Sequence, residues 1–129
     1  MGIAQRRKGK RGEQEAVNLI LPAFPLARSK RAGGESATVD RGRDILGTPG
    51  YCIQVHRGRS TPCERKLEEA VTAAEGTYDI PVALVRRDRG PWTATIRASD
   101  FLALVYQLEK LRNEYAKCVQ DRATGISLD

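Results

Sequence analysis

Long hydrophobic runs are missing from this chain of 129 residues. The longest apolar stretch, from Ala16 to Ala27, is interrupted by Asn18, Pro22 and Pro25, which leaves it too short to span a bilayer. The basic N-terminus has no apolar segment behind it, which argues against a secretory signal. We therefore expect a cytoplasmic protein that has no membrane partner.

Cysteine and histidine are also scarce. The cysteines Cys52, Cys63 and Cys118 form an odd, scattered set that is typical of free thiols in a reducing compartment. Cys52 and Cys63 do not make a closed set of zinc ligands with His56, the only histidine. The sequence contains no P-loop and no Ser/His/Asp or Cys/His hydrolase arrangement, which excludes those enzyme classes.

Positive charge, in contrast, is in excess. Lys and Arg number 22 against 16 Asp and Glu, which gives a formal net charge of +6. This balance favours a polyanionic partner such as DNA, because each neutralised phosphate releases a counterion. A solvated basic surface is the alternative. With 40% apolar and 29% charged residues, the chain suits one globular domain.

The hydrophobic periodicity predicts an α/β order of helix, three short strands, helix, two strands and helix. Residues 1–12 are expected to form a flexible basic arm, followed by a helix that Pro22 ends. A short strand and a loop follow in residues 25–40. Two further strands, at about 43–47 and 51–57, are joined by a Gly-Thr-Pro-Gly turn and lie side by side.

The second half of the chain carries clear boundary signals. Thr61, Pro62 and Glu64 predict a capped helix start. Residues 80–86 form a near-continuous apolar strand, which we expect at the centre of the sheet, and residues 92–97 form an outer strand.

A long helix is expected over residues 99–120, with Ser99 as its cap, followed by a polar tail at 123–129. We expect its first two turns to pack on the core of a domain that spans 13–122, and the remainder to be free to pair with a second subunit. The stripe consists of Phe101, Leu104, Val105, Leu108, Leu111, Tyr115 and Cys118.

The segment between Arg43 and Arg57 carries the main functional signal. Asp44 comes at the end of one expected strand, and Gln54 and His56 share one face of the next because side chains alternate in a strand. Hydrolysis of a phosphodiester with a divalent cation needs oxygen ligands that converge on one point, which this layout can supply. Taken singly, these residues also fit a turn acid, an exposed strand amide and a structural histidine.

The segments 9–15, 41–50 and 53–57, followed by 67–70, 80–82 and 89–92, resemble the small PD-(D/E)XK nucleases of bacteriophage genomes, which are related to Holliday-junction resolvases. The resemblance covers roughly residues 6–104. It implies a single-domain restriction-endonuclease-like core, a mixed central sheet flanked by helices. It also implies a metal-dependent endonuclease that hydrolyses DNA phosphodiester bonds and favours branched DNA, such as Holliday junctions, over plain duplex. A homodimer and a phage origin, hence a host cytoplasm, are implied as well.

The resemblance also implies roles for single residues. Asp44 matches the first metal-binding acid, and Glu13 matches the acid of the first helix. Gln54 stands where the family has Glu, and the Val55 carbonyl joins the shell of a bound Mg²⁺ or Mn²⁺. His56 stands where the family has the Lys that polarises water or steadies the phosphate.

Two of these positions depart from the family pattern. Gln for Glu keeps an oxygen ligand but removes a charge, so a hard cation should bind more weakly. His for Lys leaves two roles open, a general base for the attacking water or a nitrogen ligand that favours Mn²⁺. Arg43 replaces the family's proline, and Glu69 stands where resolvase-like members often have Gln.

Three functions therefore remain open. The first is an active endonuclease, the second a catalytically silent DNA-binding module on the same fold, and the third a phage structural or assembly protein that associates through its last helix. Basic residues near the expected site are assigned to phosphate binding, with an ordinary solvated surface as the alternative for some of them. They are Arg6, Arg7, Lys8, Lys10, Arg11, Lys30, Arg31, Arg57 and Arg59.

Overall fold

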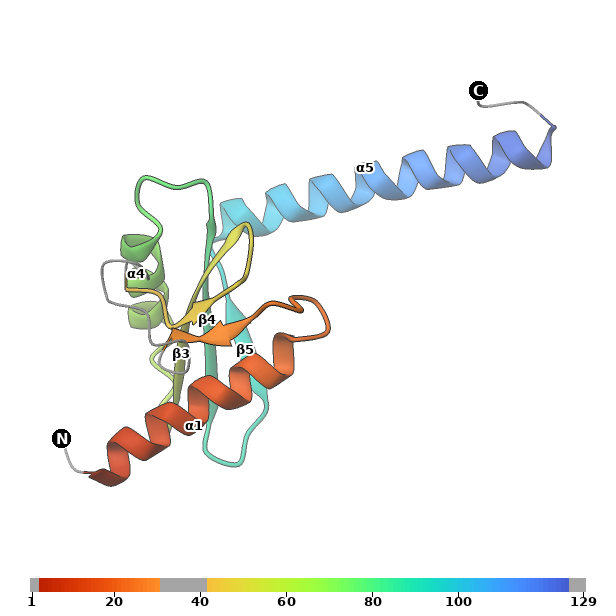
Figure 1. Ribbon diagram of the computed structural model, residues 1–129. Coiled ribbons are helices and arrows are strands. Elements are labelled where there is room, and N and C mark those ends of the chain that lie inside the picture. The colour runs from red at the N-terminus through yellow and green to blue at the C-terminus, as the bar shows by residue number, and fades with distance from the viewer. Residues whose placement is uncertain (1–2, 31–41, 126–129) are drawn as a thin grey trace. The chain divides into compact units, whose positions relative to one another are not determined.

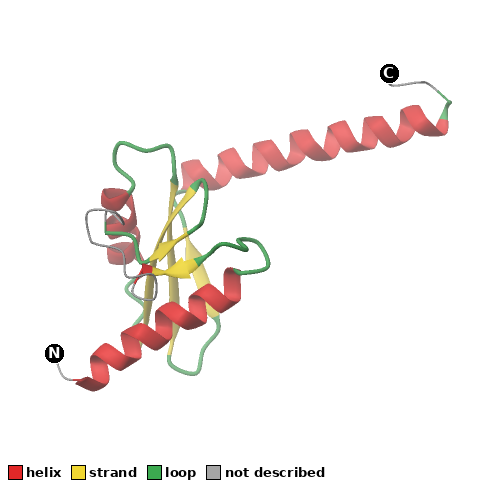
Figure 2. Ribbon diagram, viewed as in Figure 1, coloured by secondary structure: helices red, strands yellow, loops and turns green. Residues whose placement is uncertain are grey.

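The computed structural model describes residues 3–30 and 42–125, with side chains from residue 9 onward. Helices and strands alternate along these residues in an α/β arrangement (Figures 1 and 2). The helices are α1 (Ile3–Ile20), α4 (Cys63–Ala73) and α5 (Ala98–Ala123). The strands are β1 (Arg28–Ser29), β2 (Ile45–Leu46), β3 (Tyr51–Gly58), β4 (Ile80–Arg87) and β5 (Trp92–Thr95).

A mixed three-stranded sheet in the order β3-β4-β5 forms the framework. β3 and β4 are parallel with Gln54 opposite Ala83, and α4 connects them. β4 and β5 are antiparallel with Val85 opposite Thr93. The apolar β4 is the central strand and β5 is an outer one, as the sequence predicts, because a strand covered on both faces has no polar face.

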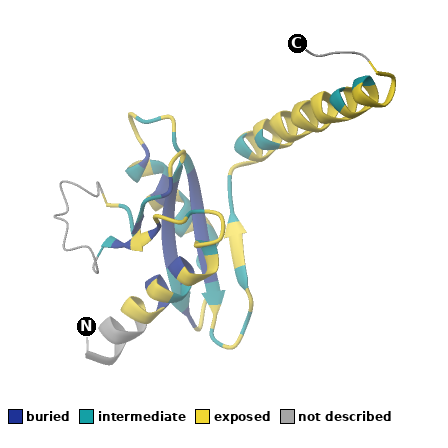
Figure 3. Ribbon diagram, turned by 45° about the vertical axis from the view of Figure 1, so that its right-hand side comes forward, coloured by how far each residue is buried: buried dark blue, intermediate teal, exposed yellow. Residues whose placement is uncertain are grey.

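The two faces of this sheet are covered by different helices. Ile53 and Val55 lie on the face that packs against Ala16 and Val17 of α1. The alternate residues of β3, including Gln54, lie on the opposite face, which α4 covers. Figure 3 shows the buried residues concentrated along β3 and β4.

β1 and β2 form a separate two-stranded antiparallel sheet, with Ser29 opposite Ile45. The predicted strand pair of 43–47 and 51–57 is therefore not a continuous ladder, although β2 lies next to β3. The turn between them is formed as expected, and the Tyr51 N–H donates to the Thr48 carbonyl at 3.0 Å. Gly47 has a φ of +79°, and a Cβ there would collide with the Leu26 carbonyl.

The helix starts differ from the sequence prediction. α1 begins at Ile3, so most of the expected basic arm is helical. Pro62 occupies the N-cap of α4 and no side chain caps that helix, so the predicted Thr61 to Glu64 capping box is wrong. Arg97, not Ser99, is the N-cap of α5. A proline at the N-cap displaces Thr61 one residue outside the helix, where its hydroxyl does not reach the first turn.

The chain divides into two compact units, Met1–Ile96 and Arg97–Asp129. α5 belongs to the second unit, and none of its residues is buried. The expectation that its first two turns pack on the core of the first unit stays a prediction; Phe101 is 53% exposed. Among the described residues, no helix combines the length and apolar character needed to cross a bilayer.

Candidate functional site

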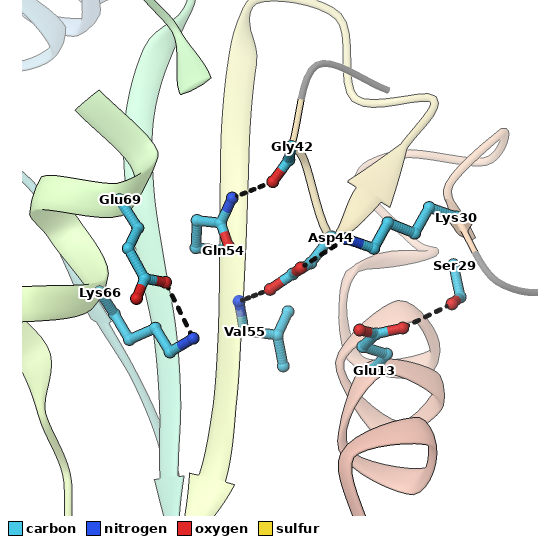
Figure 4. Close-up of polar contacts among 9 residues, drawn as sticks. All are labelled: Glu13, Ser29, Lys30, Gly42, Asp44, Gln54, Val55, Lys66 and Glu69. Atoms are coloured by element: carbon cyan, nitrogen blue, oxygen red, sulfur yellow. Dashed lines mark hydrogen bonds and ion pairs between the residues drawn. The ribbon is translucent and has the colours of Figure 1, made fainter. Parts of the chain in front are cut away.

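Asp44 lies against the edge of β3 that faces away from β4. Its backbone N–H donates to the Ile53 carbonyl at 3.3 Å, and its carboxylate Oδ2 accepts the Val55 N–H at 2.8 Å (Figure 4). The Asp44 side chain thus takes the place of a strand partner where β2 has not yet begun. The structure places Asp44 next to the Gln54 strand, as the sequence predicts.

The backbone of Val55 offers a second polar group at this edge. Within a strand, the N–H and the C=O of one residue point to the same side. Because the Val55 N–H is directed to Asp44, its carbonyl oxygen is directed to the same edge. The Val55 carbonyl therefore points to the same edge of β3 as the Asp44 carboxylate.

Lys30 brings a positive charge to Asp44. Its Nζ lies 3.4 Å from Oδ1 of Asp44, and its backbone N–H donates to the Asp44 carbonyl at 3.2 Å. The antiparallel pairing of β1 with β2 brings the two residues together. Ser29 is opposite Ile45, so Lys30, which follows Ser29, meets Asp44, which precedes Ile45. Sequence reasoning assigned Lys30 only to phosphate binding. Recognising that the two short strands pair would have placed it beside Asp44.

Glu13 is buried in α1, with 5% of its surface exposed. Its Oε2 accepts a hydrogen bond from the Ser29 hydroxyl at 2.8 Å, which ties α1 to β1. Ser29 precedes Lys30, so the contacts Glu13–Ser29 and Lys30–Asp44 follow each other along the chain. In Figure 4, Glu13, Lys30 and Asp44 all lie on the same side of β3.

Gln54 is nearly buried, and its amide Nε2 donates to the Gly42 carbonyl. In Figure 4 its side chain extends from β3 on the side opposite Asp44. A pocket of about 540 Å³ opens there between β3 and α4. Its lining consists of Gly42, Gln54, Arg65, Glu68, Glu69, Thr72 and Ala73.

His56 is half-buried on the same face as Gln54, where α4 supplies its neighbours. Burial lowers the pKa of His56 from its ordinary value, and the positive charges of Lys66 and Arg65 lower it further. A hydrogen bond to the Ser60 backbone and the charge of Glu69 act in the opposite direction and are weaker. His56 is therefore neutral at pH 7, and its charged neighbours come from α4 rather than from the Asp44 edge.

Several predicted phosphate-binding residues are placed by the structure. Lys10, Arg11 and Arg59 are exposed. Arg57 is not free, because its guanidinium donates to Glu15 at 2.6 Å. Arg31 and the side chains of Arg6, Arg7 and Lys8 lie outside the described residues.

Arg57 belongs to a small ion-pair network that holds α1 to the sheet. Oε2 of Glu15 accepts from Arg86 at 2.7 Å, while its Oε1 accepts from Arg57. Arg57 Nε also lies 3.9 Å from Asp88. Two guanidinium groups from β3 and β4 thus converge on one carboxylate, which gives Arg57 a structural role.

Arg43 and Glu69 also have partners within the fold. Arg43 forms an ion pair with Asp79 at 2.6 Å, and Glu69 pairs with Lys66 at 2.9 Å on α4. Arg43 therefore anchors the Asp44 segment to the loop before β4.

The donors at the Asp44 edge are all oxygen atoms. The Asp44 carboxylate and the Val55 carbonyl, with the Glu13 carboxylate on the same side of β3, match the preference of Mg²⁺ and Mn²⁺ for hard ligands. Among the residues that the structure describes, no three His, Cys, Asp or Glu side chains gather into a metal site. Water molecules and backbone oxygens would therefore supply most of the ligands of a bound ion.

Comparisons with protein-family models, with curated proteins and with solved structures found no match to this chain.

Proposed function

We propose that this protein is a metal-dependent endonuclease with a PD-(D/E)XK core, and that its active site is the Asp44 edge of β3. The observation that carries the proposal is the carboxylate of Asp44, which sits between the Val55 N–H and the Lys30 ammonium. Such a carboxylate, at the rim of a sheet and beside a cation, suits the handling of a phosphate and a metal together.

Mg²⁺ or Mn²⁺ would be held by Asp44 and the Val55 carbonyl, with Glu13, on the same side of β3, as a further oxygen donor. The Gln54 side chain lies on the opposite side and would join the shell only after it turns towards Asp44. When bound, the ion would lower the pKa of a water molecule and neutralise charge on the phosphate. A single carboxylate at the edge and an amide in place of the second acid favour weak metal binding, which DNA phosphates would strengthen.

Lys30 would do what a lysine at the position of His56 does in the nucleases that this chain resembles. Its Nζ lies beside Asp44 on the side of β3 opposite Gln54, where a bound phosphate would lie next to the carboxylate (Figure 4). An ammonium in this position stabilises negative charge that develops on the phosphate. His56, neutral and surrounded by α4 cations, then need not supply that charge.

The exposed basic residues Lys10, Arg11 and Arg59 would hold the DNA backbone around the site. Their contacts with phosphate carry no sequence information, which suits recognition of a DNA shape such as a four-way junction. A branched substrate is the part of the proposal that rests on family resemblance alone. The resemblance to phage nucleases would place the protein in the cytoplasm of a host cell.

Cleavage of a labelled four-way junction and of a matched linear duplex tests this proposal, with Mg²⁺ and Mn²⁺ separately. Asp44→Asn is the appropriate variant, because its amide oxygen still accepts the Val55 N–H while the charge is lost. Asp100→Asn, which removes a partly buried acid of α5 that pairs with Arg97, is the matched control. We expect metal-dependent cutting by wild type and by the control, and a loss of roughly 100-fold or more in Asp44→Asn.

A catalytically silent DNA-binding module is the second candidate. The observation that favours it is the Gln54 amide, which is committed to the Gly42 carbonyl and carries no charge. This candidate predicts salt-sensitive binding of DNA in EDTA, no cutting with either metal, and equal affinity of wild type and Asp44→Asn. That combination would refute the nuclease proposal and retain the nucleic-acid partner.

A further inference from the structure

The long helix α5 exposes a continuous apolar stripe. The helix has 26 residues, corresponding to roughly 39 Å at 1.5 Å per residue, and none of them is buried. Leu108, Leu111 and Tyr115 are 47%, 61% and 73% exposed. Large apolar side chains aligned over this length favour association, because water is released when such a stripe is covered.

The spacing of the stripe follows a seven-residue repeat rather than the 3.6-residue period of a helix packed on a sheet. Its members alternate at intervals of three and four, which is the pattern of the first and fourth positions of a coiled-coil heptad. These positions are Phe101, Leu104, Leu108, Leu111, Tyr115 and Cys118. The repeat therefore specifies another helix of the same periodicity as the partner.

Charges beside the stripe select the orientation of that partner. The residues before each first position are Asp100, Gln107, Glu114 and Asp121. In an antiparallel pair these positions face each other across the seam, which brings acids against acids. In a parallel pair, each of these residues instead faces the position five residues later on the partner helix. Gln107 then meets Arg112, Asp100 meets Val105 and Glu114 meets Val119.

We propose that α5 pairs with α5 of a second copy of this chain as a parallel two-stranded coiled coil. The stripe is self-complementary, the parallel arrangement avoids like-charge contacts, and the helix forms a compact unit without residues of the sheet unit. The proposal is independent of nuclease activity and would hold equally for a protein that only binds DNA.

Cys118 provides a direct probe of the orientation. It lies at a fourth position of the heptad, so in a parallel pair the two Cys118 side chains face each other across the seam. In an antiparallel pair each would lie opposite the start of the partner helix, too far from its counterpart for a disulfide. The other two thiols are outside α5, and Cys52 is buried.

The test uses the full chain and measures its mass by light scattering after gel filtration. We expect twice the 14.2 kDa of one chain for wild type, and half that dimer mass for Leu108→Asp and Leu111→Asp. Tyr106→Asp is the matched control, because Tyr106 is 73% exposed on the same helix but lies off the stripe. It should leave the dimer mass unchanged.

Mild oxidation of the cysteines tests whether the two α5 helices are parallel. A covalent dimer should form in wild type, persist in Cys63→Ser and disappear in Cys118→Ser. Leu111→Cys in the Cys118→Ser background should restore it, because residue 111 is the preceding fourth position. A wild-type monomer at all concentrations, a dimer that survives Leu108→Asp, or failure of both cysteine positions to cross-link would each overturn the proposal.

Discussion

The two sides of β3 present different chemistry. At its outer edge, the Asp44 carboxylate is held by a backbone N–H and faces the Lys30 ammonium. On the face covered by α4, Gln54 and His56 are neutral groups, and their charged neighbours belong to the helix. The proposed endonuclease would therefore find the charge for a phosphate at the edge of the strand. Gln54 and His56, which stand where the resembled nucleases have Glu and Lys, lie on its face.

Among the following changes, removal of the Lys30 charge should have the largest effect, and it acts on the rate of DNA cleavage. If the Asp44 edge is the active site, Lys30→Met should slow junction cleavage by about 100-fold, because a charge-stabilising group next to the reacting phosphate is lost. Lys10→Met removes an exposed lysine of α1 and should weaken binding without changing the maximal rate. Single-turnover kinetics with saturating protein separates the two effects. Equal maximal rates for both variants would contradict the role of Lys30.

Gln54→Glu tests the α4 face of β3 through stability. An ionised Glu cannot donate to the Gly42 carbonyl, so the free energy of unfolding should fall by about 1–3 kcal/mol in EDTA. If Gln54 is a metal ligand, added Mn²⁺ should reverse part of this loss, since the new carboxylate would bind the ion more tightly. Gln14→Glu, on the exposed side of α1, is the control and should show neither effect. Thermal melting with and without metal measures both, and a loss that Mn²⁺ leaves unchanged would remove Gln54 from the metal site.

Arg57 and Arg59 are close in sequence, but we expect Arg57 to stabilise the fold and Arg59 to bind DNA. Arg57→Gln breaks the ion pair with Glu15 and should lower the free energy of unfolding by about 1 kcal/mol. Arg59→Gln should leave stability unchanged but weaken DNA binding and reduce its salt dependence by about one counterion. Denaturant unfolding and salt titrations of DNA affinity check the two expectations, and the reverse assignment would show that Arg57 serves the DNA.

The smallest expected effect is the pH dependence that His56 contributes. Its pKa is lower in the folded protein than the ordinary value of about 6.5, so the unfolded chain binds more protons in the window below 6.5. Stability from this group is fully present above pH 6.5 and declines as the pH falls through that window. The loss between pH 7.5 and 5.5 should be smaller in His56→Gln than in wild type, as measured by urea unfolding. An identical pH dependence would show that burial and Lys66 do not act on this imidazole.

Much of the sheet could be predicted from the sequence. The apolar run of β4 identifies the central strand, and the alternation in β3 correctly places Gln54 and His56 on one face. These features depend on local periodicity, which a single chain displays directly. The same periodicity did not reveal which helix covers that face, because helix packing is decided by distant residues such as Ala16 and Ala70.

The Asp44 site could be predicted only in part. The strand-end position of Asp44 was visible in the sequence, whereas the contact of Lys30 depends on two strands of two residues each, too short for a pattern. The stripe of α5 was also visible, but burial on a core and pairing with another helix share nearly the same spacing over two turns.

Binding of Mn²⁺ followed by electron paramagnetic resonance tests the central claim most directly, because bound ions lose the signal of the free ion. It compares Asp44→Asn, at the edge of β3, with Glu69→Gln, on the α4 side. The account predicts one Mn²⁺ site per chain in wild type and in Glu69→Gln, and its loss in Asp44→Asn. A site that survives Asp44→Asn and is lost in Glu69→Gln, or no site in wild type, would contradict it.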